Sequence, residues 1–235
     1  MRKKGFTLIE VLLVVAILAL IMSSVYMTFT STLKSKTYVE EISNLRQEGR
    51  AFMRIFQRNV SAAYLSAQSY VPKQGQQFQP NTFFIGIHDT YNGRDMDRLL
   101  FTSLGHMIVV SGRYHGEGEV PIGQSEHAVA GFFALSDYPG VIYLFDAPFF
   151  ANVPFSDLVA GLLGDLNKYR FPVMDGVVEF SVQYFDWVMK DWKNEWDSTK
   201  NNRLPIMVKS TLVLSDSSGR EEPFYTLVEL PRAIK

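Results

Sequence analysis

The chain opens with a long apolar run. Residues 6–29 contain one charged side chain, that of Glu10, in 24 positions, and most of the others are aliphatic or aromatic. A helix needs about 20 consecutive apolar residues to cross the hydrocarbon layer of a membrane. The pattern therefore predicts a membrane-spanning helix at the amino terminus.

A helical pattern continues beyond this span. Apolar residues and one glycine recur at intervals of three and four, at Ile42, Leu45, Gly49, Phe52, Phe56, Val60 and Ala63. Such spacing places them on one helical face, and no proline interrupts residues 6–71. We expect one helix from residue 7 to about residue 67, roughly 90 Å long at 1.5 Å per residue. The alternative is a membrane anchor and a separate amphipathic helix, joined near residues 31–35.

Short strands separated by turn residues are expected in the middle of the chain. Residues 68–81 are polar, rich in glutamine and interrupted by two prolines, so they predict the connection out of the helix. The apolar segments that follow predict strands at residues 82–87, 99–103, 107–111, 130–135 and 141–145. Residues 156–166 have the spacing of a short helix.

The carboxy-terminal third has the clearest strand pattern. Apolar residues alternate with polar ones at Val178, Phe180, Val182 and Tyr184. This is the period of a half-buried strand. Two further strands are expected at residues 206–214 and 224–230, joined through the turn sequence Asp216-Ser217-Ser218-Gly219. Together the three segments predict an antiparallel meander.

Length and composition indicate the fold class. Of the 235 residues, 47% are hydrophobic and 14% aromatic, which is too apolar for a disordered tail. About 170 residues follow the predicted helix, enough for one domain with its own core. We expect an α+β protein in which a long amino-terminal helix, first transmembrane and then amphipathic, packs on a mainly antiparallel β-sheet domain. The expected parts are a leader at residues 1–5, a transmembrane part at 6–29, an amphipathic part at 30–67 and a globular β-rich domain at 68–235.

Charge and cysteine content exclude two kinds of chemistry. The formal net charge is −1, and without Arg2, Lys3 and Lys4 it becomes 20 minus 24, or −4. A nucleic-acid surface requires an excess of basic charge, so nucleic acid is not expected as a partner. The absence of cysteine excludes disulfides and thiolate catalysis.

The residues before the apolar run differ from an ordinary secretory signal. Such a signal places small residues after its apolar core, whereas here a glycine precedes the core, in Lys3-Lys4-Gly5-Phe6-Thr7-Leu8-Ile9-Glu10. This string resembles the class III signal of type IV pilins and of the pseudopilins of type II secretion. The resemblance implies that a prepilin peptidase cuts after Gly5 and methylates the new amino terminus, Phe6. A plain single-span anchor with a basic flank is the alternative.

Glu10 is the least expected residue of the span. A carboxylate near the hydrocarbon layer is costly, and residues of this kind usually have a function. The pilin resemblance implies that Glu10 pairs, on assembly, with the terminal amine of a neighbouring subunit. That amine corresponds here to Phe6.

The basic residues of the leader predict the orientation of the span. Arg2, Lys3 and Lys4 lie directly before it, and positive charges at this place remain in the cytoplasm. In a Gram-negative host, we therefore expect a single-pass inner-membrane protein with a cytoplasmic amino terminus and a periplasmic globular domain.

A second resemblance lies in the carboxy-terminal third, around the three tryptophans. Its residues are Tyr184-Phe185-Asp186, Trp196-Asp197-Ser198, Leu204-Pro205 and Leu230-Pro231. The pattern resembles the J-type minor pseudopilin of type II secretion, and together with the amino-terminal signal it covers about half of the chain. The resemblance implies that the partners are sibling minor and major pseudopilins, in a complex at the filament tip that helps to start assembly.

Two interpretations are open for the tryptophans. They hold a long loop onto the sheet, since an indole buries a large area and needs a single acceptor, or they anchor a neighbouring subunit, as aromatic residues often do at interfaces. The candidate interface residues are Ile42, Leu45, Phe52, Phe56, Trp192 and Trp196.

No catalytic constellation is recognisable in the sequence. His88, His106, His115 and His127 lack the spacing that places two histidines on one helical face for zinc, and no glycine-rich phosphate loop occurs. Residues 88–97 concentrate oxygen ligands around Asn92-Gly93, which fits either a calcium site or, more simply, a solvated β-hairpin. We expect no enzymatic activity, no metal, no cofactor and no small-molecule substrate.

These patterns favour a minor pseudopilin of type II secretion that acts at the tip of the pseudopilus. A minor pilin of a type IV pilus shares the whole amino-terminal argument, and the tryptophan-containing pattern favours secretion over it. A membrane-anchored periplasmic enzyme is the third alternative, and the lack of a catalytic constellation disfavours it.

Overall fold

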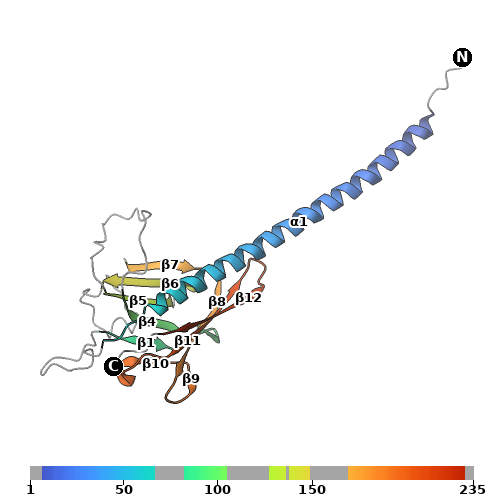
Figure 1. Cartoon of the computed structure of the whole chain (residues 1–235). Coiled ribbons are helices and arrows are strands. Elements are labelled where there is room, and N and C mark those ends of the chain that lie inside the picture. Colours follow the sequence, from blue (N-terminus) through green and yellow to red (C-terminus); the bar gives the residue numbers. More distant parts are fainter. Residues whose placement is uncertain (1–6, 67–81, 105–126, 136–137, 149–168, 231–235) are drawn as a thin grey trace, which may run out of the picture. The chain divides into compact units, whose positions relative to one another are not determined.

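The computed structural model describes residues 7–66, 82–104, 127–135, 138–148 and 169–230 (Figure 1). The chain divides into two compact units, Met1–Leu45 and Arg46–Lys235. Helix α1 (Leu8–Ser61) contributes to both units, so that its last part, from Arg46 onward, belongs to the second unit. The connection, strand and helix predicted at residues 68–81, 107–111 and 156–166 lie outside the described residues.

Helix α1 extends beyond the predicted membrane-spanning part, but it ends before the predicted residue 67. It continues through residues 31–35, so the alternative of a joint there is wrong. It ends at Ser61 instead of near residue 67, because the backbone finds another partner: the Tyr64 N–H donates to the Thr102 carbonyl at 2.9 Å. The chain thus leaves the helix and contacts a strand. The spacing of apolar residues, from which the end of the helix was predicted, does not show that this hydrogen bond forms.

Within the described residues, six strands form the larger antiparallel sheet, in the order β10-β1-β4-β5-β6-β7. They are β1 (Phe84–Ile87), β4 (Arg98–Leu104), β5 (His127–Leu135), β6 (Tyr138–Pro148), β7 (Arg170–Met174) and β10 (Trp196–Asp197). The strands predicted at residues 82–87, 99–103, 130–135 and 141–145 are confirmed as β1, β4, β5 and β6. The sequence pattern did not predict β7 and β10, which are short edge strands.

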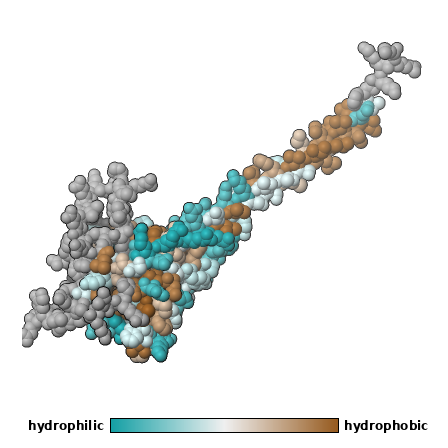
Figure 2. Space-filling view, viewed as in Figure 1, coloured by the Kyte–Doolittle hydropathy of each residue, from teal (hydrophilic) through white to brown (hydrophobic). Residues whose placement is uncertain are grey.

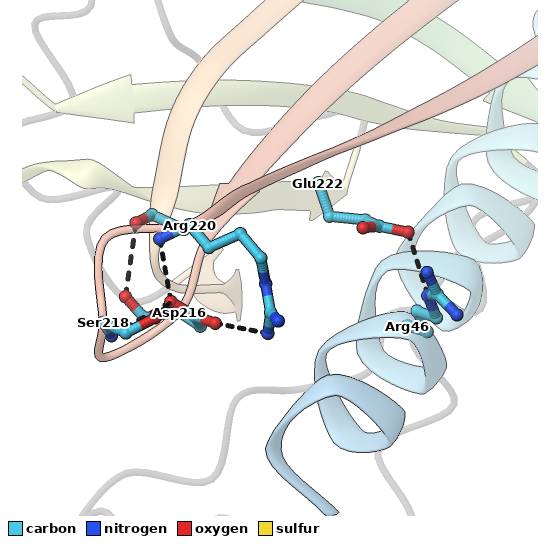
Figure 3. Close-up of polar contacts among 6 residues, drawn as sticks. Arg46, Asp216, Ser218, Arg220 and Glu222 are labelled. Atoms are coloured by element: carbon cyan, nitrogen blue, oxygen red, sulfur yellow. Dashed lines mark hydrogen bonds and ion pairs between the residues drawn. The ribbon is translucent and has the colours of Figure 1, made fainter. Parts of the chain in front are cut away.

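The smaller sheet contains the predicted meander. Its order is β12-β11-β8-β9, with β8 (Val177–Asp186), β9 (Asp191–Lys193), β11 (Met207–Ser215) and β12 (Glu221–Glu229). The turn between β11 and β12 lies where Asp216 to Gly219 predicted it. The Asp216 carboxylate accepts hydrogen bonds from the N–H groups of Ser218 and Arg220 at 3.0 and 2.9 Å (Figure 3).

One residue of the meander faces a different side than predicted. Glu179 lies opposite Val213, but Val177 lies opposite Leu214, so Val178 is an additional residue in a β-bulge. Val177 is therefore buried, whereas Val178 is only partly buried. The predicted alternation is correct from Phe180 to Tyr184 and wrong for Val178.

The core of the second unit forms where α1 contacts both sheets. Phe52 and Phe56 are fully buried and contact Phe132 of β5 and Phe180 of β8, with ring centroids 5.1–6.1 Å apart. The helix also comes close to β12, because a Cβ placed on Gly49 would lie 2.5 Å from the ring of Phe224. The protein is thus α+β, with a long amino-terminal apolar helix and antiparallel sheets in the pilin-like arrangement that the sequence predicted.

Candidate functional site

The amino-terminal functional segment coincides with the start of α1. The N–H groups of Glu10 and Val11 donate to the Thr7 carbonyl at 3.1 and 3.3 Å, which opens the helix. Glu10 therefore lies in the first helical turn, where the free N–H groups favour a carboxylate, and its side chain is exposed. Gly5 and Phe6, the predicted cleavage and methylation positions, lie outside the described residues.

The apolar residues after Glu10 are exposed on all sides of the helix. Leu12, Leu20 and Met22 are 61%, 72% and 61% exposed, and Figure 2 shows hydrophobic side chains along this part of α1. Among the described residues, α1 is the one helix long and apolar enough to cross a membrane. A continuous apolar surface of this size requires lipid or other protein chains around it.

The candidate interface residues of α1 fall into two groups. Ile42 and Leu45 are partly exposed. Phe52 and Phe56 are fully buried within the second unit, so they offer no surface to a partner. The spacing that grouped the four residues describes one helical face, and it does not show which part of that face the sheets cover.

The tryptophan-containing segment between β8 and β11 is not a simple loop. Strand β9 pairs with β8, so that Trp192 lies opposite Phe185. Strand β10 pairs instead with β1 of the larger sheet, with Trp196 opposite Gly86. A one-turn helix, α3 (Ser198–Asn201), follows directly. The segment therefore joins the two sheets.

The three residues Trp196-Asp197-Ser198 each contribute a different contact to this joint. Trp196 is 2% exposed, and its Nε1 donates to the Arg203 carbonyl at 3.1 Å. Asp197 caps α3 by accepting from the Thr199 N–H at 2.9 Å. The Ser198 Oγ accepts from the Phe84 N–H of β1 at 2.8 Å. Trp196 thus holds the segment onto the sheet, as the first interpretation of the tryptophans predicted.

The other two tryptophans retain surface. Trp192 is partly exposed, and its ring packs on Phe185 at 5.3 Å between centroids. Trp187, which was not among the candidate interface residues, lies in the β8–β9 turn and is 55% exposed. Met189 of the same turn is 67% exposed. Trp187 therefore has the most free surface of the three.

An ion pair that the sequence did not predict completes the joint. Arg203 donates from Nη2 to both oxygens of Asp186, at 3.0 and 2.9 Å. Burial opposes ionisation of Asp186, but hydrogen bonds from the Val188 N–H and from Arg203 outweigh it, so the pKa of Asp186 lies below its usual range. The sequence contained one indication of this pair, since Asp186 is a carboxylate at the end of an apolar strand. A buried carboxylate needs a cation or several hydrogen-bond donors.

Asp97, one of the residues that suggested a calcium site, connects the segment at residues 88–97 to strand β8. Asp97, 2% exposed, accepts from the Val182 N–H of β8 at 2.7 Å and lies 2.8 Å from the Nδ1 of His88. Burial raises the pKa of Asp97 to about 6, although these hydrogen bonds act against the shift. The hydrogen bond with Asp97 in turn raises the pKa of His88.

The segment itself is a hairpin of β2 (Thr90–Tyr91) and β3 (Arg94–Asp95). Asn92 and Gly93 have φ angles of 51° and 77°, as a type I′ turn requires, so the hairpin interpretation is confirmed. Within the part of the chain that the structure describes, no group of three or more histidine, aspartate or glutamate side chains is arranged to hold a metal ion.

Comparison with known protein families gives a match to the amino-terminal segment. Residues 1–26 match the family model of the prokaryotic N-terminal methylation motif. No curated protein matches the chain. The motif and the exposed apolar helix indicate a membrane-anchored protein. They support a pilin-like protein, either a type IV pilin or a pseudopilin, that a prepilin peptidase processes and that assembles with other pilins.

Proposed function

We propose that this protein is a minor pseudopilin of a type II secretion system. In this proposal it acts at the tip of the pseudopilus and supports protein export across the outer membrane. The methylation motif and the α+β fold support the pilin-like class as a whole. The preference for secretion depends on the carboxy-terminal residues that resemble the J-type subunit.

The observation that carries this preference is that those residues form one connected unit. Asp186 binds Arg203, and the carbonyl of Arg203 accepts from Trp196. Leu204 and Pro205 are buried directly afterwards. Residues that are separate in the sequence thus contribute to one connection between the two sheets, which supports treating them as a single motif.

Assembly in this proposal begins in the inner membrane. After cleavage at Gly5, the first part of α1 exchanges lipid for the helices of sibling subunits, an exchange between two apolar surroundings. Glu10 needs a new partner in this process, because an unpaired carboxylate is costly in hydrocarbon. The methylated amine of Phe6 in a neighbouring subunit provides the positive charge.

Deletion of the gene in its host tests the proposal. We expect exported proteins to accumulate in the periplasm while surface motility stays normal, and we expect a plasmid copy of the gene to restore export. Lost motility with normal export would assign the protein to a type IV pilus. Normal export and motility, with a hydrolytic activity in the purified protein, would assign it to the periplasmic enzymes.

A further inference from the structure

Four arginines recur at every fourth residue in the last part of α1, at Arg46, Arg50, Arg54 and Arg58. All four are exposed. At 1.5 Å and 100° per residue, each lies about 6 Å further along the helix than the previous one and about 40° further around it. They form a stripe about 18 Å long, which we call the arginine stripe.

Most of the arginine stripe has no partner within the described part of the chain. Arg46 donates to Glu222 of β12 at 2.9 Å (Figure 3). Arg50, Arg54 and Arg58 make no ion pair or side-chain hydrogen bond with any residue that the structure describes. Three guanidinium groups therefore face solvent on one side of the helix.

Between Arg46 and Arg58, the side of α1 that carries the stripe contains no carboxylate. The helical repeat places Gln47, Gln57 and Ser61 among the arginines, and all three are exposed. Glu48 lies on another side, where it lines a groove with Asp175 of the second unit. Figure 2 shows hydrophilic side chains over this part of α1.

The spacing of the stripe is not one that stabilises a helix, although Arg46 binds Glu222 of β12. Like charges four residues apart on a helix repel each other and destabilise it. An arginine is nevertheless well suited to binding a carboxylate, because its planar guanidinium forms two parallel hydrogen bonds and is weakly hydrated. A row of arginines, three of which have no partner among the described residues, is complementary to an acidic partner even though the chain has a net charge of −1.

We propose that the arginine stripe is a docking surface for an acidic polypeptide segment. The matching segment carries carboxylates about 6 Å apart, the distance between Glu or Asp residues at every fourth position of a helix. A polypeptide fits better than a nucleic acid or an anionic membrane, since the stripe is one helix face wide and the carboxylate of Glu222 lies at its first arginine. That the segment belongs to a sibling subunit rests on the proposed function; the chemistry of the surface does not.

A pair of synthetic helical peptides tests the surface directly. One carries four glutamates at every fourth position, and the other carries glutamines instead. The full chain, held in nanodiscs of neutral phospholipid, should bind the glutamate peptide more tightly than the glutamine peptide, and added salt should weaken the binding. The variant R50Q/R54Q/R58Q should lose about tenfold in affinity, as expected for three exposed charge pairs.

A matched variant separates the stripe from net charge. K190Q/K193Q/K200Q removes the same number of positive charges from exposed positions outside α1, and it should bind as the wild type does. The reversed variant R50E/R54E/R58E should instead prefer a peptide with lysines at the same four positions. Thermal unfolding of R50Q/R54Q/R58Q should be unchanged or slightly higher, because the change relieves repulsion within the helix.

Three results would overturn the proposal. They are equal binding of the glutamate and glutamine peptides, an equal loss in the control variant, and tighter binding of a DNA duplex or of anionic phospholipid vesicles than of the glutamate peptide. Because the binding measurement involves no secretion, it separates failure of this surface from failure of the proposed function, which the gene deletion tests.

Discussion

The two parts of α1 use apolar side chains in opposite ways. Before Leu45, large apolar residues such as Leu18 and Leu20 are 52% and 72% exposed, whereas Phe52 and Phe56 in the last part are fully buried. The difference lies in their distribution: apolar residues surround the first part and form one stripe on the last part. The sheets of this chain therefore cover the last part, while lipid or other chains must cover the first. The stability of the fold should consequently depend on the apolar residues of the last part, and the contacts of the span with lipid or with other helices should depend on those of the first part.

The largest expected effect concerns the leader, which precedes the first part. Substitution of Gly5 with a bulky residue, as in Gly5→Leu, should block cleavage completely and leave the protein in the membrane with residues 1–5 attached. The intact mass of the membrane-extracted protein measures this, with Ser23→Leu as the control that should be cleaved normally. A wild-type chain that retains Met1, or that is cut beyond Ser23, would contradict the proposed processing.

A matched pair of truncations tests the comparison itself. Phe56→Ala should lower the free energy of unfolding by about 3–5 kcal/mol, the usual loss for a buried phenylalanine. Leu20→Ala should change it by less than about 0.5 kcal/mol, because Leu20 is exposed and surface changes rarely exceed this. Denaturant unfolding of the full chain in detergent, followed by tryptophan fluorescence, gives both values. Equal losses in the two variants would show that the two parts do not differ as described.

Glu10 should affect assembly without affecting the fold. Loss of one partner from a fully desolvated ion pair costs about 3–5 kcal/mol, and a tip subunit with few neighbours should lose less. Glu10→Ala should therefore be cleaved and should unfold as the wild type does, but should co-purify poorly with sibling subunits. Glu40→Ala is the control, since Glu40 makes only an exposed pair with Lys36 at 3.6 Å. Normal co-purification and export in the Glu10 variant would refute the pairing.

The smallest expected effect is a pH dependence that belongs to the second unit. The pKa of Asp97 is raised from 3.8 to about 6, so the native state holds this proton more tightly than the unfolded chain and loses that stability as the pH rises through about 6. The pKa of His88 is raised from 6.5 as well, so its contribution is complete below 6.5 and is lost as the pH rises through the native value.

Both groups thus act in the same direction. The free energy of unfolding should fall by about 1–3 kcal/mol between about pH 5 and pH 8. In His88→Gln the fall should be smaller, because glutamine can still donate to Asp97 but does not titrate. Denaturant midpoints across this pH range measure the effect. A wild-type free energy of unfolding that stays constant or increases over this pH range would contradict the effect expected from His88 and Asp97.

Local patterns accounted for much of the fold. The exposed span of α1, the buried stripe at Phe52 and Phe56, and the hairpin at Asn92-Gly93 each depend on residues close in the sequence. Helical and strand periods and turn residues report such features directly. The same holds for β11 and β12, which a short turn joins directly.

The arrangement of the candidate site could be predicted only in part. The residues Trp196-Asp197-Ser198 were recognised, but not the contact of Ser198 with Phe84 or the pairing of β10 with β1. Arg203 was missed, because nothing in its spacing shows that Asp186 is buried beside it. Partners more than a hundred residues apart, such as Phe84 and Ser198, leave no periodic signal.

The sequence by itself determined an apolar amino-terminal helix with a lone carboxylate at its head, an amphipathic continuation and a carboxy-terminal meander. These follow from short-range periodicity, which sets which residues face lipid, core or solvent. Only the tertiary structure decided that α1 ends at Ser61, that Val178 forms a bulge and that Trp196 is buried while Trp187 is exposed. Each of these outcomes depends on contacts between residues far apart in the sequence, such as Tyr64 and Thr102, and these residues come together only in the folded chain.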